Sequence, residues 1–233
     1  MKMGCSTQIK VQPAIAQTKR SINNDYIYDV VIIGGGYSGL AAAIYTGRAS
    51  LNPLVFCGKS ETVQPLQTQA IQDYPGFLSI DRSTLIQNQK EQALTCGAKL
   101  MFEDVQSIDS QQYPFVIFHD GKQSKTNSII MATGLLLTNN GIDFVQQSTD
   151  QKNENCNKSD THVVFKYPQT KILDGIVTME RGYISLNHNN QMTSKAGIFA
   201  AGACCDPKYH LPVISAASGA KAALDCERWL AQK

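Results

Sequence analysis

Residues 28–45 contain the feature that most constrains the fold. They combine an apolar run, a glycine-rich turn and an alanine-rich segment, in that order. Four consecutive β-branched residues, Val30 to Ile33, predict a strand that is buried on both faces, as in a parallel sheet. The glycines at 34, 36 and 39 form the pattern G-x-G-x-x-G, and the alanines that follow favour a helix. Strand, turn and helix in this order indicate the start of a Rossmann-type βαβ unit.

The three glycines of this pattern have different predicted roles. Gly34 permits the tight turn, Gly36 lets the backbone approach a pyrophosphate, and Gly39 lets helix and strand pack closely. Free N–H groups and a partial positive charge at the start of the helix favour an anion there. The pattern therefore predicts a dinucleotide site. A tight strand-to-helix turn without a ligand is the competing interpretation.

Composition and charge argue against several other classes of protein. The chain has 233 residues, 42% of them hydrophobic, and a formal net charge of +2. These values predict an ordinary globular protein, and they favour neither nucleic acid nor an acidic surface as a partner. No apolar run is long enough to span a bilayer. The seven cysteines have no metal-ligand spacing, which predicts reduced thiols and an intracellular, cytoplasmic location.

The rest of the chain predicts one α/β domain over residues 26–233, preceded by a flexible tail at 1–25. The tail is basic, so a mitochondrial transit peptide is the alternative. Further strands are predicted at 54–57, 100–108, 115–119, 128–132, 181–186 and 197–202, and helices at 81–96 and 212–231. Asp120-Gly121 predicts the turn between the strands at 115–119 and 128–132. Residues 138–161 are polar and predict a linker.

The second predicted strand lacks a residue type that dinucleotide sites usually have. An Asp or Glu at the end of this strand commonly binds the ribose hydroxyls. Here the strand ends in Cys57-Gly58-Lys59. Either another group binds the ribose or the site is weakened.

Several blocks occur in the order in which one known family carries them. They are V-I-I-G-G-G-Y-S-G at 31–39, D-Y-P-G-F at 73–77, I-I-M-A-T-G at 129–134, G-Y-I at 182–184, G-I-F-A-A-G at 197–202 and S-A-A-S-G at 215–219. With these blocks, residues 28–136 and 163–231 resemble the flavin domain of low-molecular-weight thioredoxin reductases and related disulphide-reducing flavoproteins.

The resemblance implies a Rossmann-like FAD-binding domain that has a parallel central sheet and a small antiparallel three-stranded excursion. The cofactor-binding residues that it implies are Gly34, Gly36, Tyr37, Ser38, Gly39, Gln64, Asp73, Val105, Thr133, Gly134 and Gly202. Those at 34–39 would hold the pyrophosphate, Val105 would meet the adenine through its backbone, and Gln64 and Asp73 would lie near the flavin. Because family members are commonly homodimers through this domain, a homodimer is a further expectation.

Two parts of that family's reductase are missing from the 233 residues. There is no second G-x-G-x-x-G or G-x-G-x-x-A fingerprint for NADPH, and no Cys-x-x-Cys pair to pass electrons to thioredoxin. The polar linker at 138–161 stands where the family inserts its NADPH domain. A complete reductase cycle is therefore not expected of this chain.

Three flavin-side positions also depart from the family pattern. Ala203 replaces an aspartate, Pro212 has no N–H to donate, and Thr62-Val63 replace a glycine pair. Each lost hydrogen bond costs on the order of 1 kcal/mol. The sequence therefore favours a degenerate, non-catalytic relative, a pseudoenzyme, that serves as a structural or interaction subunit of a larger assembly. The alternative is an active stand-alone flavoprotein oxidoreductase that a partner protein or a dithiol reduces. A deletion variant is a third interpretation, and the polar linker argues mildly against it.

No residue is predicted to be catalytic or to bind a metal. The adjacent Cys204 and Cys205 predict two buried or half-exposed thiols rather than a redox pair, because a vicinal disulfide is strained and nothing indicates a lowered thiol pKa. The four histidines share no motif spacing and are predicted at the surface or in turns: His119, His162, His188 and His210.

Overall fold

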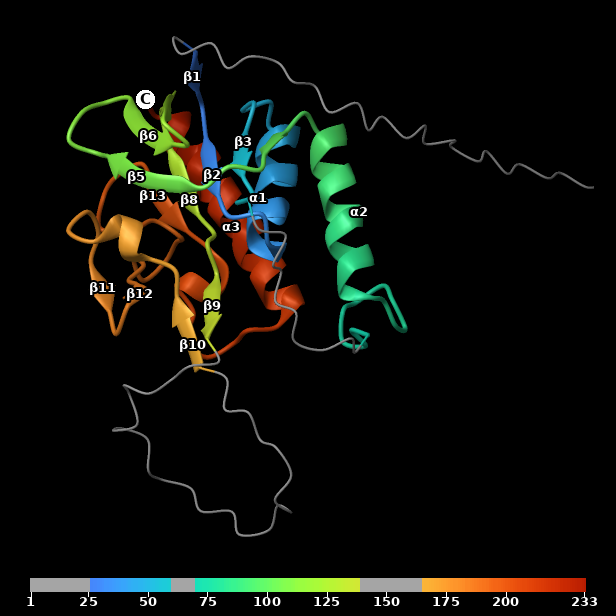
Figure 1. Cartoon of the computed structure of the whole chain (residues 1–233). Helices are drawn as coiled ribbons and strands as arrows, with labels where there is room; N and C mark the ends of the chain where they lie inside the picture. Colours follow the sequence, from blue (N-terminus) through green and yellow to red (C-terminus); the bar gives the residue numbers. More distant parts are fainter. Residues whose placement is uncertain (1–25, 60–69, 139–164) are drawn as a thin grey trace, which may run out of the picture.

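The computed structural model describes residues 26–59, 70–138 and 165–233, and its centre is a parallel sheet of five strands (Figure 1). The strand order is β13-β8-β2-β3-β4. These strands are β2 (Val31–Ile33), β3 (Leu54–Phe56), β4 (Lys99–Met101), β8 (Ile129–Met131) and β13 (Ile198–Ala200). Every residue of β2 is buried and β2 pairs with a parallel strand on each side, which confirms the prediction from its β-branched run.

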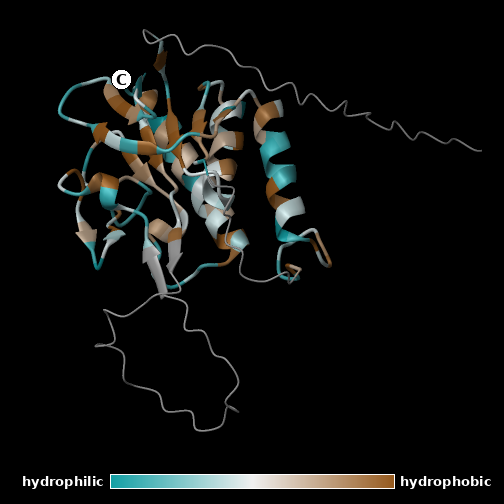
Figure 2. Cartoon of the chain, viewed as in Figure 1, coloured by the Kyte–Doolittle hydropathy of each residue, from teal (hydrophilic) through white to brown (hydrophobic). Residues whose placement is uncertain are grey.

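Three helices cover one face of this sheet. They are α1 (Tyr37–Arg48), α2 (Arg82–Thr95) and α3 (Pro212–Leu230). Alanines of α1 and α3 pack with Val30, Ile32 and Phe199 in one apolar cluster. Figure 1 shows α1 between the central strands and α2. Figure 2 shows apolar central strands beside the largely hydrophilic α2.

A second sheet covers the opposite face. Its order is β1-β7-β6-β5, from β1 (Ile27–Tyr28), β5 (Val105–Asp109), β6 (Phe115–His119) and β7 (Lys122–Thr126). The last three are antiparallel, whereas β1 joins β7 in parallel. Phe115 and Ile117 of β6 pack against Val31 of the central sheet. The predicted α/β class with a three-stranded antiparallel excursion is thus confirmed, with β1 as an added edge.

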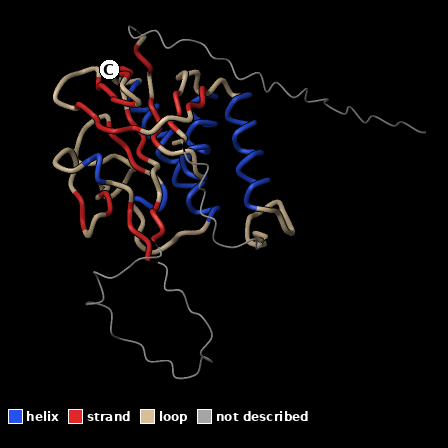
Figure 3. The backbone as a smooth tube through the Cα atoms, viewed as in Figure 1, coloured by secondary structure: helices blue, strands red, loops and turns tan. Residues whose placement is uncertain are grey.

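Short elements complete the described chain, and Figure 3 shows them as brief strands and turns beside the three helices. They are β9 (Leu135–Thr138), β10 (Phe165–Pro168), β11 (Met179–Glu180), β12 (Tyr183–Ile184), η1 (Lys171–Leu173) and η2 (Gly202–Cys204). Strands β9 and β10 pair in antiparallel fashion, with Thr138 opposite Phe165. The tail at 1–25 and nearly all of the polar linker lie outside the described residues.

Three predicted strands need correction. The run at 100–108 forms two strands, β4 and β5, in different sheets. The strand that follows the Asp120-Gly121 turn is β7, which lacks apolar residues, while 128–132 contributes β8 to the central sheet. Within 181–186 only Tyr183–Ile184 is a strand, because Arg181 and Gly182, with φ of 51° and 82°, form a turn.

No helix within residues 26–59, 70–138 and 165–233 is long and apolar enough to cross a membrane.

Candidate functional site

Two glycines of the loop between β2 and α1 are required by the packing of the protein itself. Gly34 has a φ of 125°, and a Cβ there would overlap the carbonyl oxygen of Ala132. A Cβ on Gly39 would overlap the carbonyl oxygen of Gly34. These contacts hold α1 directly against the end of β2. Both residues therefore play the turn and packing roles that the sequence predicts.

Gly36, the third glycine, is different because no atom of the described residues crowds it. Its φ of −85° is ordinary for any residue, and apart from its chain neighbours no described heavy atom lies within 4 Å of the position of a Cβ. Gly36 is the N-cap of α1, which has no side-chain cap and no acidic residue in its first turn. The first N–H groups of a helix have no partner inside it. Open space beside uncapped N–H groups fits the pyrophosphate of a dinucleotide.

Ser38 and Gly202 meet where α1 and α3 cross. A Cβ on Gly202 would lie 2.6 Å from the Ser38 hydroxyl oxygen, and one on Gly219 would overlap the Ser38 carbonyl. The N–H of Gly202 donates to the Ser218 hydroxyl at 3.0 Å. Small residues at the start of the last helix thus allow a close approach, as the sequence predicts. They bring Gly202 to the first turn of α1.

Thr133 and Gly134 follow β8, beside the glycine loop. The Thr133 hydroxyl donates to the carbonyl oxygen of Gln169 at 2.6 Å, and the Gln169 N–H donates to the Gly134 carbonyl at 3.0 Å. Gly134 has a φ of 70° and open space at its Cβ position. The Thr133 hydroxyl proton is thus already used within the protein, while Gly134 leaves room beside the sheet.

Tyr37 lies at the start of α1 against the first turn of α2. The Arg82 guanidinium carbon lies 5.9 Å from the centre of the Tyr37 ring. Burial raises the pKa of Tyr37, and the nearby Arg82 opposes this shift. Tyr37 packs with Tyr74 against the apolar cluster of Ile71, Ile80 and Leu85. This cluster places the 71–80 segment beside the start of α1.

Two predicted site residues lie in the 60–80 region, and the structure describes one of them, Asp73. Asp73 is exposed on the 71–80 segment, which an isolated bridge between Ile71 and Ile80 closes. Gln64 lies outside the described residues, as do Thr62 and Val63.

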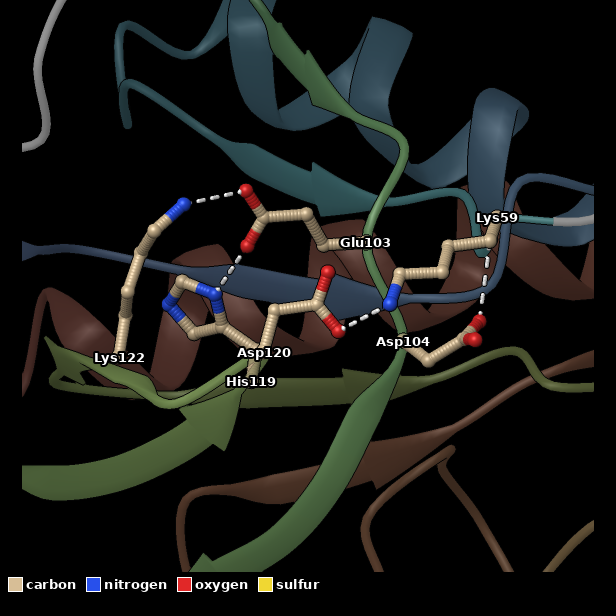
Figure 4. Close-up of polar contacts among 6 residues, drawn as sticks. All are labelled: Lys59, Glu103, Asp104, His119, Asp120 and Lys122. Atoms are coloured by element: carbon tan, nitrogen blue, oxygen red, sulfur yellow. Dashed lines mark hydrogen bonds and ion pairs between the residues drawn. The ribbon is translucent and has the colours of Figure 1, made fainter.

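A charged corner lies at the end of β3 and next to Val105, the first residue of β5 (Figure 4). The Lys59 N–H donates to Asp104 Oδ1 at 3.0 Å, and Lys59 Nζ pairs with Asp120 at 2.8 Å. Glu103 pairs with Lys122 at 2.8 Å. No role for these side chains is predicted from the sequence. Their partners lie on separate elements, and no local signal joins them.

His119 corrects one sequence prediction. It was expected at the surface or in a turn, yet it is fully buried at the end of β6. Its Nδ1 lies 2.6 Å from Glu103 Oε2, and its Nε2 lies 2.9 Å from the Ser124 hydroxyl. Its ring packs against Phe56 at a tilt of 52°, with the ring centroids 4.6 Å apart. Both ring nitrogens have partners, which compensates for their removal from water. This arrangement ties the hairpin of β6 and β7 to the charged corner.

The adjacent cysteines are thiols, as the sequence predicts. Cys204 is buried and Cys205 is half-buried, and both are free. The neighbouring Cys204 sulfur and burial raise the pKa of Cys205 above its usual range. The hydrogen bond with Cys205 lowers the pKa of Cys204, so the two thiols shift in opposite directions. Because the thiolate is the reactive form, Cys205 is the less reactive of the two. Within the described ranges no three His, Cys, Asp or Glu side chains are grouped so that they could hold a metal ion.

Comparisons with known proteins point to one family. The pyridine nucleotide-disulphide oxidoreductase family matches residues 28–164. The chain is 31% identical to a thioredoxin reductase of Spironucleus barkhanus over 300 aligned positions, which cover 87% of this chain and 98% of that protein. It is 35% identical to a thioredoxin reductase of Dictyostelium discoideum over 130 residues, 52% of this chain and 41% of that protein.

A solved structure supports the same relationship. The thioredoxin reductase from Giardia duodenalis is similar in fold, with a TM-score of 0.72 and 27% sequence identity, over 87% of this chain and 98% of that one. A thioredoxin reductase from Gloeobacter violaceus shares the fold at 16% identity, also with a TM-score of 0.72.

Proposed function

Because the chain belongs to the pyridine nucleotide-disulphide oxidoreductase family, among its thioredoxin reductase-like members, we propose that it binds FAD along the carboxyl ends of β2, β3 and β8. The carboxyl edge of a parallel sheet is where such folds bind their ligands. When bound, FAD would supply two-electron redox chemistry. The residues of the chain would bind and orient it.

The open, uncapped start of α1 is the observation that carries this proposal. Gly34 and Gly39 are explained by contacts within the protein, but Gly36 is not, since a side chain would fit there without a clash. A glycine that the protein does not need for its own packing is explained by a ligand that must approach the backbone. The N–H groups at this helix start would bind the pyrophosphate.

The other binding residues follow from their positions around this point. We assign Tyr37 and Ser38, in the first turn of α1, to the region of the pyrophosphate, and Gly202 to the ribityl chain and the flavin. Thr133 and Gly134 would border the cofactor at the end of β8. Val105 would lie at the adenosine end, and Gln64 and Asp73 near the flavin. These assignments, like the homodimer and the intracellular location with the mitochondrion as alternative, stay predictions.

We further propose that residues 26–233 form one domain in which the NADPH domain of the reductases is absent. The alignment with the Spironucleus protein has 300 positions, whereas this chain has 233 residues. Some positions of that protein therefore have no counterpart here. The lack of a second glycine fingerprint and of a Cys-x-x-Cys pair supports the same proposal. A chain of this kind would hold FAD without its own hydride donor site or exchange dithiol.

The flavin side of the site supports a degenerate, non-catalytic subunit rather than an active reductase. Ala203 offers no carboxylate, and Pro212 opens α3 without an N–H. The N–H of Gly202 already donates to Ser218. The alternative, an active flavoprotein that a partner protein or dithiol reduces, is favoured by the open glycine loop alone.

The absorbance spectrum of the full chain, purified without added flavin and then mixed with FAD, tests the binding proposal. We expect a bound flavin band at about 450 nm that remains with the protein after gel filtration. A protein that stays colourless with excess FAD would overturn the proposal.

Anaerobic reduction of the FAD-bound chain tests the finer proposal. We expect NADPH and dithiothreitol to leave the flavin band unchanged, while dithionite, as the control, bleaches it. Bleaching of the flavin band by dithiothreitol would favour the alternative, an active flavoprotein that a dithiol reduces. Bleaching by NADPH would contradict the absence of a hydride donor site.

A further inference from the structure

The end of β3 borders the glycine loop directly. The Cys57 N–H donates to the Met101 carbonyl at 2.7 Å, so β3 and β4 end together. A Cβ on Gly35 would lie 2.9 Å from the Cys57 sulfur, so the glycine loop lies on this strand end. A ribose that follows a pyrophosphate bound at α1 would therefore reach the corner formed by Cys57, Gly58 and Lys59. None of these three residues offers a carboxylate.

A carboxylate reaches this corner from another part of the chain (Figure 4). Asp104 belongs to the connection between β4 and β5, and its Oδ1 accepts the Lys59 N–H at 3.0 Å. The same oxygen lies 3.3 Å from the position of a Cβ on Gly58. Asp104 is exposed, and among the described residues its Oδ2 has no hydrogen-bond partner. One oxygen thus fixes the carboxylate at the strand end, and the other remains available.

We propose that Asp104 binds the hydroxyl groups of the adenosine ribose and so replaces the acid that β3 lacks. The proposal rests on FAD binding at the glycine loop. A carboxylate accepts hydrogen bonds from ribose hydroxyls, as the strand-end acid does in other dinucleotide folds. Asp104 is thus a positioning and specificity residue of the cofactor site.

The other carboxylates of the corner are already occupied. Both oxygens of Glu103 are used, Oε1 by Lys122 and Oε2 by His119. Asp120 forms the ion pair with Lys59 Nζ, which turns the ammonium group away from Asp104. Asp104 is therefore the carboxylate in the corner that is free of an ammonium partner among the described residues.

The charge of the corner predicts which adenosines it accepts. Lys59 and Lys122 pair with Asp120 and Glu103, and Lys90 acts on Cys57, so among the described residues no ammonium group forms an ion pair with Asp104. An unpaired carboxylate attracts hydroxyl donors and repels a phosphate. The corner should therefore favour the unmodified ribose of FAD or ADP over the 2′-phosphorylated ribose of NADP-type molecules.

Binding of ADP and of its 2′-deoxy and 3′-deoxy analogues to the flavin-free full chain tests this proposal by calorimetry. We expect the unsubstituted chain to prefer ADP over at least one deoxy analogue by about tenfold, as a hydrogen bond to a charged group predicts. Asp104→Ala should bind ADP and that analogue equally. Asp104→Asn keeps an oxygen that can accept the Lys59 N–H, so it removes the charge without removing that hydrogen bond. It should lose most of the preference for ADP over the deoxy analogue.

Asp109→Asn is the charge-matched control, since it removes one negative charge from the far end of β5, where Asp109 contacts Gln111 and Gln112 rather than Lys59. It should keep the preference for ADP. We also expect the unsubstituted chain to bind AMP more tightly than adenosine 2′,5′-bisphosphate. This difference in affinity should be smaller in Asp104→Asn. FMN, which has no adenosine, should bind equally to the unsubstituted chain and to both Asp104 variants.

The outcomes separate this proposal from the proposed function. If the unsubstituted chain binds neither FAD nor ADP, both are overturned. If it binds both but Asp104→Asn keeps the full preference for ADP, only the role of Asp104 is overturned. The same holds if Asp109→Asn loses as much of the preference. Thermal unfolding of each variant identifies loss of fold, and if Asp104→Ala unfolds, the Asn variant carries the test.

Discussion

The turn from β2 to α1 and the segment from β13 to α3 have the same local plan but different environments. In both, a buried strand ends near a glycine with positive φ, 125° at Gly34 and 76° at Gly202, and a helix follows. The first turn leaves Gly36 open and α1 uncapped. In the second, the Gly202 N–H donates to Ser218, and α3 begins with Pro212.

The difference shows that a glycine after a strand does not by itself make a binding site. Ser38 of α1 fills the space beside Gly202, whereas none of the described residues fills the space beside Gly36. The open turn, at the start of α1, is the binding site that we propose.

Gly39→Ala should have the largest effect. Its Cβ would overlap the Gly34 carbonyl, and the backbone there cannot move without separating α1 from β2. We expect the free energy of unfolding to fall by about 3 kcal/mol, the upper end for overpacking. Urea unfolding of the flavin-free chain measures it. If Gly39→Ala lowered the free energy of unfolding by less than Gly36→Ala does, the packing role of Gly39 would be contradicted.

Gly36→Ala should separate binding from folding. A Cβ fits at Gly36 without a clash, so we expect the free energy of unfolding to change by less than about 1 kcal/mol, the usual size of a helix N-cap effect. The affinity for FAD should fall by at least about tenfold, or 1.4 kcal/mol, because the methyl group occupies the approach of the pyrophosphate. Flavin fluorescence titration measures the affinity. Unchanged affinity would indicate that the loop is a ligand-free turn.

Ala203→Asp should strengthen the binding of FAD at the segment from β13 to α3. The resemblance to the reductases implies a carboxylate here, and a hydrogen bond to a charged group contributes about 1.5–3 kcal/mol. We therefore expect FAD to bind about tenfold more tightly or better. Ala203→Asn, which has the same size without the charge, is the control in the same titration. No gain from Asp would show that the α3 region does not contact the cofactor.

Glu103→Gln should give the smallest effect, on the stability of the charged corner. Burial opposes ionisation of Glu103, but hydrogen bonds from Lys122 and His119 outweigh it and lower its pKa below the ordinary value of 4.5. A lowered pKa stabilises the folded state above pH 4.5, and this contribution is lost as the pH falls through the folded-state pKa.

The variant should therefore be less stable than the unsubstituted chain by less than about 1 kcal/mol at neutral pH, as for an ion pair whose ammonium group, here that of Lys122, is exposed. The gap should close in acid. Thermal unfolding of both proteins between about pH 3 and 7 would measure this difference in stability, because that range includes the ordinary pKa values of carboxylates. A gap that is constant across this range would show that the ionised form of Glu103 is not favoured by folding.

Several elements could be predicted because their signals are local. The β-branched run before Gly34 and the alanines after Gly39 fix a strand and a helix by their own preferences. Strand β7, Lys122–Thr126, has no apolar residue and so carries no such signal. It forms because β6 and β1 pair with it on either side, and that pairing is not written in its own residues.

The sequence by itself determined the strand, the glycine turn, the helix and the family resemblance, since each depends on residues close together in the chain. Only the tertiary structure decided which glycine is open and which charged groups meet. Gly36 is open because no element of the described residues packs on it, whereas Gly39 is enclosed by the Gly34 carbonyl. Asp104 meets Lys59 across 45 residues, because parallel strands β3 and β4 end side by side and bring distant connections to one edge of the sheet.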